Sequence, residues 1–118
     1  MGSLAQSLWI LHVLCAAAYL SMAVFITARR PGALLNRACA AIVVCFFVWS
    51  SCLAVSHHPD VSKQTAALFY SVGSFAWASF ASIAVAFIVA FLEPARLKIW
   101  AFRAALVVPP AIVIYGQW

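Results

Sequence analysis

The sequence predicts an all-α, polytopic membrane protein: a single domain over residues 1–118 with four transmembrane helices in an antiparallel up-down bundle. Hydrophobic residues make up 68% of the chain, charged residues only 8%, and the mean hydropathy is +1.10. A soluble domain carries roughly 45–50% apolar and about 25% charged residues, and a chain this short buries too little surface to hide such a composition from water. The apolar residues also gather in stretches of roughly the 20 residues that cross a bilayer.

Helix breakers separate these stretches. Pro31 ends the first stretch, Pro59 ends the second, and Pro94 separates the third from the fourth. Pro109 and Pro110 lie inside the fourth stretch and are expected to kink it, because two consecutive prolines remove two backbone donors. Short connections make neighbouring helices antiparallel, and backbone groups in lipid must satisfy one another, which helices of this length achieve. The predicted helices cover residues 4–28, 35–55, 65–92 and 97–115.

Basic residues predict the orientation of these helices. The second connection holds only Lys63. The first and third connections and the helix starts beside them hold six basic residues: Arg29, Arg30, Arg37, Arg96, Lys98 and Arg103. Cytoplasmic loops of membrane proteins carry the excess of Lys and Arg, so both termini and the segment "SHHPD" are predicted to lie outside. The net charge of +5 is therefore a topology signal, and no nucleic-acid partner is expected, since that function needs a basic surface with stacking aromatics.

The sequence holds few residues that could perform catalysis. Its two acidic residues, Asp60 and Glu93, fall at the ends of apolar stretches, and no nucleophile–base pair accompanies them. General acid–base chemistry needs positioned titratable groups, so the chain is predicted not to be an enzyme.

The cysteines lie in apolar stretches without CxxC spacing, where thiols usually act as small hydrophobic side chains; they are Cys15, Cys39, Cys45 and Cys52.

The three histidines form the most distinctive candidate site. His12 lies near the outer end of the first helix, and His57 and His58 lie at the outer end of the second. An antiparallel hairpin makes these ends neighbours, so the imidazoles could meet with Asp60 above them. Histidine ligates transition metals and haem, yet adjacent helical residues point about 100° apart and rarely share one ion. No cofactor is predicted; the favoured interpretation is that "SHHPD" is a solvated loop tip, with haem or metal binding by these histidines as the alternative.

Small residues recur along the third predicted helix at every fourth position. Such spacing lets two membrane helices approach closely. The favoured interpretation is an internal contact, and the alternative is a homodimer interface. The residues of this face are Ser74, Ala78, Ser82, Ala86 and Ala90.

Residues 26–55, "ITARRPGALLNRACAAIVVCFFVWSSCLAV", resemble the first hairpin of the N-terminal seven-transmembrane sensor region of bacterial histidine kinases. That family shows a basic turn with proline, an Asn-Arg pair opening the second helix, and a tryptophan deep within it. An aromatic pair opens its third helix and a proline–small pair lies in its fourth. The matching motifs here are Arg29-Arg30-Pro31, Asn36-Arg37, Trp49-Ser50, Phe69-Tyr70 and Pro110-Ala111. The resemblance covers the first four of the seven helices of that region.

The resemblance implies a non-catalytic sensor or input domain of a two-component system in the bacterial inner (cytoplasmic) membrane. Such a domain responds to a small hydrophobic or extracytoplasmic ligand by helix repacking, with the bilayer and other transmembrane helices as partners. The alternative is a small accessory subunit of a respiratory, photosynthetic or transport complex, which would provide packing surface only. The candidate ligand-binding residues are His12, Tyr19, Trp49, His57 and His58.

Overall fold

The computed structural model describes residues 2–117, and within that range the chain is all α-helical apart from short connections. The first three helices begin and end within two residues of the predicted positions, and a short 3-10 helix, η1, precedes the fourth α-helix. The elements are α1 (Gly2–Arg29), α2 (Leu34–Ser56), α3 (Lys63–Leu92), η1 (Pro94–Lys98) and α4 (Trp100–Gln117).

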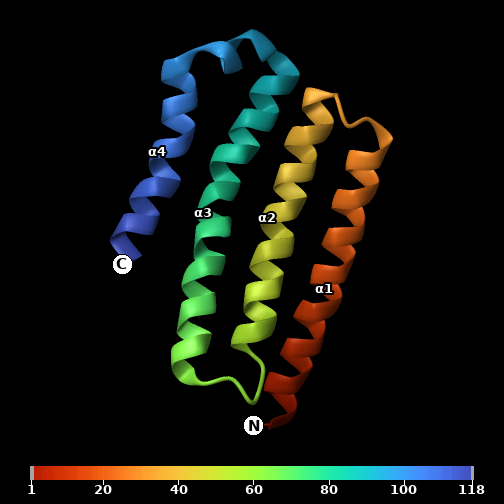
Figure 1. Ribbon diagram of the computed structural model, residues 1–118, viewed down its shortest axis with the longest axis vertical. Helices are drawn as coiled ribbons and strands as arrows, with labels where there is room; N and C mark the ends of the chain where they lie inside the picture. Colours follow the sequence, from red (N-terminus) through yellow and green to blue (C-terminus); the bar gives the residue numbers. More distant parts are fainter. Residues whose placement is uncertain (1, 118) are drawn as a thin grey trace.

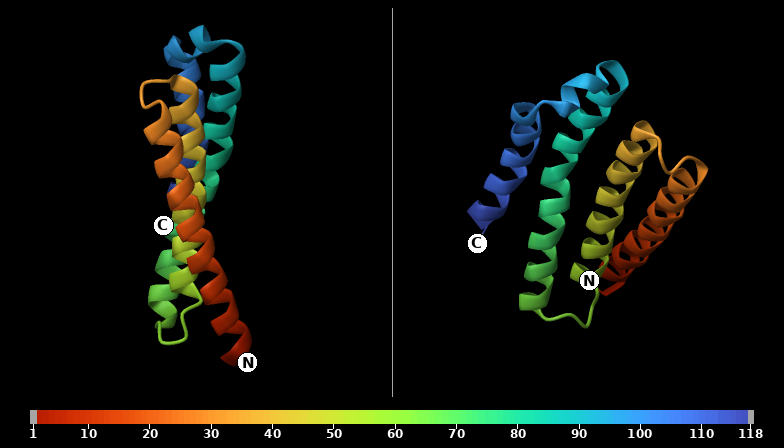
Figure 2. Two further views of the ribbon diagram at one scale, coloured as in Figure 1. Left: turned by 90° about the vertical axis from the view of Figure 1, so that its right-hand side faces the viewer. Right: turned by 45° about the horizontal axis from the view of Figure 1, so that its top comes forward.

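The four α-helices lie side by side in chain order and alternate in direction (Figure 1). Among residues 2–117, α2 packs against α1 and α3, and α4 packs only against α3 and η1. The extents are 52 × 35 × 16 Å, so the molecule is a single layer little thicker than one helix of about 10–12 Å, as its edge-on view shows (Figure 2).

The antiparallel up-down order is therefore as predicted, but the predicted bundle does not form, because α1 and α4 stay at opposite edges of the row. A helix directs bundle formation through a single apolar stripe. These helices are apolar around most of their circumference, and nothing in the pattern brings the two edges together.

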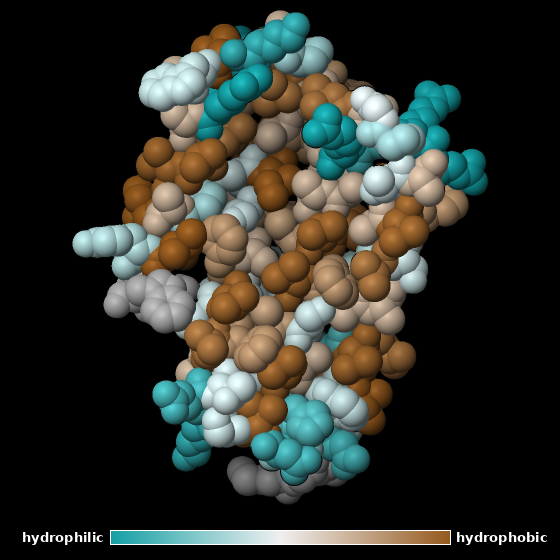
Figure 3. Space-filling model, in the orientation of Figure 1, coloured by the Kyte–Doolittle hydropathy of each residue, from teal (hydrophilic) through white to brown (hydrophobic). Residues whose placement is uncertain are grey.

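This arrangement leaves the layer without a closed core. The buried apolar residues are small or medium in size, and no large side chain in the described part of the chain is fully buried. Large apolar side chains cover the broad face instead, with polar residues gathered at the two ends (Figure 3). The buried apolar residues are Ala16, Ala23, Val43, Cys52, Ala54 and Ala76.

Three of the helices are long and apolar enough to cross a membrane: Gln6–Arg29 within α1, all of α2, and all of α3, with 24, 23 and 30 residues. The apolar part of α4, Trp100–Gly116, is shorter, and α4 ends partway along α3 (Figure 1). Length and composition therefore support three of the four predicted spans.

Local interactions explain where the helices begin. The Ser62 hydroxyl accepts a hydrogen bond from the Thr65 backbone N–H at 3.1 Å, which caps α3 and lets it begin at Lys63 rather than at the predicted residue 65. The predicted start of the fourth helix at residue 97 is wrong, because Pro94 opens η1 and α4 begins at Trp100. α4 continues as an α-helix through both of its internal prolines.

The six basic residues that predict the topology share one end of the layer. The end of α1, the start of α2, η1 and the start of α4 all lie at that end, opposite the connection at residues 57–62 (Figure 1). The Asn36 side chain donates a hydrogen bond to the carbonyl of Ile26 at 3.3 Å. Ile26 is among the last four residues of α1, whose carbonyls lack helical partners, so Asn36 ties the start of α2 to the end of α1.

Candidate functional site

Two of the three histidines form a pair at the end of the layer opposite the basic residues. The rings of His12 in α1 and His57 at the C-terminus of α2 stack with centroids 5.4 Å apart and planes inclined by 29°. Both side chains are half-buried. The pair follows from the hairpin, which places the beginning of α1 beside the end of α2.

Hydrogen bonds define the proton positions on the rings of His57 and His58. His57 Nδ1 lies 2.8 Å from the Leu53 carbonyl oxygen, and because that oxygen can only accept, Nδ1 carries the proton and the neutral ring keeps its lone pair on Nε2. His58 Nδ1 instead accepts from the Asp60 backbone N–H at 3.3 Å, so its neutral ring carries the proton on Nε2. Adjacent histidines therefore present opposite tautomers.

The third imidazole does not join the pair. The His58 ring meets Trp9 of α1 edge to face, with centroids 5.1 Å apart and planes at 89°. Only two of the three imidazoles that could have met therefore do so, since neighbouring residues at a helix end project in different directions. Within residues 2–117, no group of three His, Cys, Asp or Glu side chains is placed to hold a metal ion.

The structure divides "SHHPD" into two parts. Pro59 and Asp60 are exposed, as a solvated loop tip requires, whereas His57 and His58 are half-buried. Both histidine rings contact α1, so they belong to the α1–α2 interface as much as to the loop.

One face of α1 supplies these contacts. Its residues recur at intervals of three and four, the spacing that places side chains on one side of a helix. The alanines of the face are buried, and its three ring-bearing residues contact α2 or the connection that follows it. The face consists of Trp9, His12, Ala16, Tyr19 and Ala23.

An aromatic cluster crosses the middle of the layer from α1 to α3. Tyr19 stacks on Phe46 of α2 with centroids 5.5 Å apart. Phe46 also lies 5.0 Å from Phe80 and 6.4 Å from Trp77, both in α3. The residues of this cluster are Tyr19, Phe46, Trp49, Tyr70, Trp77 and Phe80.

Trp49 is the second residue through which α2 joins the aromatic cluster. Its ring centroid lies 6.0 Å from that of Tyr70 and 5.9 Å from that of Trp77. A β-carbon added at Gly73 would lie 3.0 Å from Trp49 Cε3 and 3.0 Å from Cys52 Cβ. Gly73 therefore permits the close approach of α3 to α2 that brings these rings together.

The five predicted ligand-binding residues thus occupy three positions. His12 and His57 form the stacked pair, His58 packs on Trp9, and Tyr19 and Trp49 belong to the aromatic cluster.

The sequence-based prediction missed the other members of the cluster. Phe46 and Trp49 are three residues apart, as are Trp77 and Phe80, and that spacing on neighbouring helices is the signal that indicates a shared ring contact.

Several serine hydroxyl groups donate hydrogen bonds to backbone carbonyls of their own helices. Ser21, Ser51 and Ser74 each donate to the carbonyl four residues earlier, at 2.8, 2.8 and 2.9 Å. This local bond is a common use of serine in membrane helices, and it takes these hydroxyls away from any polar site between helices.

The four cysteines are unpaired, and Cys52 alone is buried.

The chain matches no protein-family model, no curated protein and no solved structure. The resemblance to the sensor region of histidine kinases therefore stays a prediction from the motifs of residues 26–111.

Proposed function

We propose that this chain is a non-catalytic sensor or input domain that crosses the bacterial inner membrane several times, similar in kind to the signal-receiving region of a histidine kinase. Three long apolar helices support a membrane location. The gathering of basic residues at one end of the layer supports an orientation with that end in the cytoplasm. In this orientation the His12–His57 pair faces the extracytoplasmic side.

The observation that carries the proposal is a series of ring contacts between three neighbouring helices. The His12–His57 pair and the Tyr19–Phe46 contact lie along the same α1–α2 interface. Phe46 also contacts Phe80 of α3. A change in the spacing of α1 and α2 at the outer end would therefore alter contacts on both sides of α2.

The mechanism we propose is a shift between two packings of these helices. A ligand changes such an equilibrium only through different affinities for the two arrangements. A small hydrophobic or extracytoplasmic ligand that inserts beside the imidazole pair would favour the arrangement with α1 and α2 further apart. The aromatic cluster would pass that change to α3.

Disulfide trapping tests this mechanism in native membranes. The variant carries His12→Cys and His57→Cys after the native cysteines are replaced by alanine, and the rate of oxidative cross-linking reports the spacing of α1 and α2. Ile10→Cys with His57→Cys is the matched control, because Ile10 is 45% exposed and lies off the face that contacts α2. We expect rapid cross-linking for the first pair only, and a change of several-fold in that rate with fractions of the cell's own medium or lipid extract. A rate that no fraction changes would contradict a sensing role.

A second candidate function is a structural subunit of a larger membrane complex. The broad faces of the layer favour it, since Trp77, Phe91 and Trp100 are 53%, 68% and 82% exposed and could pack against further subunits. Purification from native membranes in mild detergent, followed by mass spectrometry and an absorption spectrum, separates the candidates. A defined set of respiratory, photosynthetic or transport subunits would overturn the sensor proposal. A Soret band that His12→Ala or His57→Ala abolishes would also overturn the sensor proposal, and it would indicate haem-dependent electron transfer instead.

A further inference from the structure

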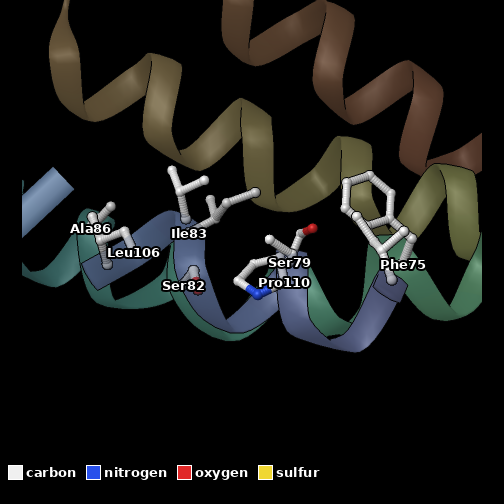
Figure 4. A pocket seen from close by; sticks show the side chains of 10 residues that line it. Phe75, Ser79, Ser82, Ile83, Ala86, Leu106 and Pro110 are labelled. Carbon is white, nitrogen blue, oxygen red and sulfur yellow. The ribbon is translucent and has the colours of Figure 1, made fainter. Parts of the chain in front are cut away.

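An apolar groove of about 410 Å³ runs between α3 and α4, a volume within the range of small-molecule sites. Residues of both helices line it, from Ala86 and Leu106 at one end to Phe75 at the other (Figure 4). No charged residue lines the groove, so its occupant must be apolar along this length.

Small side chains on α3 create the space. Ser79, Ser82 and Ala86 face Leu106 and Pro110 of α4 across the groove. Ser82 and Ala86 belong to the small-residue face that the sequence predicts to be a helix contact, and here α4 approaches that face without filling it. The groove runs along the two helices, as the acyl chain of a lipid runs along a transmembrane helix.

The groove-lining stripe of α4 leads to a basic residue. Leu106 and Pro110 follow Arg103 by three and seven positions, so Arg103 lies on the same side of α4, one turn beyond the groove. The Arg103 Nε–H donates to the Leu97 carbonyl oxygen, which holds the guanidinium group beside η1.

Two positive charges at this end are not balanced by the nearby carboxylate. Glu93 forms an ion pair with Arg96, whereas Arg103 and Lys98 have no acidic partner in the described part of the chain. An anion at the mouth of the groove would therefore complement Arg103.

We propose that the groove holds one acyl chain of an anionic phospholipid whose phosphate binds Arg103. This inference rests on the membrane location and orientation in the proposed function. Anionic lipids enrich the cytoplasmic leaflet and are attracted to basic residues at that surface, and guanidinium groups bind phosphate through paired hydrogen bonds. The apolar lining of the groove matches the acyl chain of such a lipid, and the basic residue at its mouth matches the phosphate headgroup.

Native mass spectrometry of the detergent-purified protein tests the inference. The probes are phosphatidylglycerol and phosphatidylcholine with identical acyl chains. We expect one phosphatidylglycerol to be retained in preference to phosphatidylcholine. Arg103→Gln should weaken this preference about fivefold, the effect of one basic residue at a lipid headgroup, whereas Ala86→Phe should abolish retention by filling the groove.

Two matched variants separate the site from general effects of charge and size. Arg29→Gln removes the same charge at the same end of the layer but at its opposite edge, and Ala81→Phe adds the same ring at an exposed position of α3. Both should retain the lipid as the native chain does, and circular dichroism confirms that each variant is helical.

Equal retention of both lipids, or retention unchanged in Arg103→Gln and Ala86→Phe, would overturn the lipid site. A protein dimer that Ala86→Phe dissociates, without bound lipid, would overturn it in favour of a second copy of this chain. Topology labelling of the same preparations shows whether the chain is in the membrane, so a failure of the proposed function is distinguishable from a failure of the lipid site.

Discussion

Replacing Gly73 with alanine is expected to push α2 and α3 apart. The added β-carbon would lie 3.0 Å from both Cys52 Cβ and Trp49 Cε3, and 3.3 Å from Trp49 Cζ3. Carbon atoms attract one another at about 3.5–4.0 Å, so relief of the clash requires a shift of about 0.5 Å. The indole ring can give way in part, but Cys52 Cβ is fixed to the helix backbone and cannot.

The cost of this shift can be estimated from the contacts that it weakens. A radial gap of about 0.5–1 Å forfeits a quarter to a half of each van der Waals attraction, and insertion of extra carbon into a packed interface typically costs about 1–3 kcal/mol. Alanine also gains up to about 1 kcal/mol over glycine in helix propensity. Gly116→Ala adds the same methyl group to a helix without a clash, because no atom lies within 4 Å of the β-carbon it would add.

We therefore expect Gly73→Ala to be about 1–3 kcal/mol less stable than Gly116→Ala. The measurement is unfolding in mixed detergent micelles with increasing dodecyl sulfate, followed by tryptophan fluorescence and by circular dichroism. Gly73→Leu should destabilise further, since its side chain extends the clash. Equal stability of Gly73→Leu and the native chain would show that α2 and α3 do not approach closely at this position.

Three further substitutions test smaller features by the same unfolding measurement. Ser62→Ala should lower stability by about 1 kcal/mol through loss of the cap on α3, while Ser62→Asp should preserve it; equal loss in both would exclude a capping role. His12→Ala should lose about 0.5–1.5 kcal/mol of ring stacking on His57 that His12→Phe retains, and identical stabilities of the two variants would argue against the stacked pair. Glu93→Gln should change stability by less than about 1 kcal/mol, because its ion pair is exposed and screened; a larger effect would indicate a buried network.

The sequence predicts the helices well because their ends are specified locally. Pro31, Pro59 and Pro94 each stop a helix for steric reasons that do not depend on tertiary structure. The start of α4 is missed by three residues because a proline at a helix start suits a 3-10 turn as well as an α-helix, and here Pro94 opens η1.

The arrangement of the helices is less accessible from sequence. A row of helices and a closed bundle bury different faces of each helix. Helices that are apolar on nearly all sides carry no pattern that favours one arrangement over the other. In lipid, the hydrophobic effect gives little preference either, since an acyl chain covers a leucine as well as another helix does.

The candidate site shows the same division between local and tertiary information. The nearness of His12 and His57 follows from hairpin geometry alone, which is why the sequence predicts it. The turn of His58 toward Trp9 depends on the side-chain directions at the end of α2. The groove at Ser82 and Ala86 depends on where α4 lies, which the sequence leaves open.

Labelling of single cysteines with a membrane-impermeant maleimide tests most directly whether this chain spans the membrane in the proposed orientation. The two variants are Ser62→Cys, beside the connection at residues 57–62, and Gly32→Cys, in the connection at the basic end, each in a chain without native cysteines. We expect Ser62→Cys to react in intact spheroplasts and Gly32→Cys to react only after the membrane is opened. Reaction of both in intact spheroplasts, or the reverse pattern, would contradict the proposed arrangement.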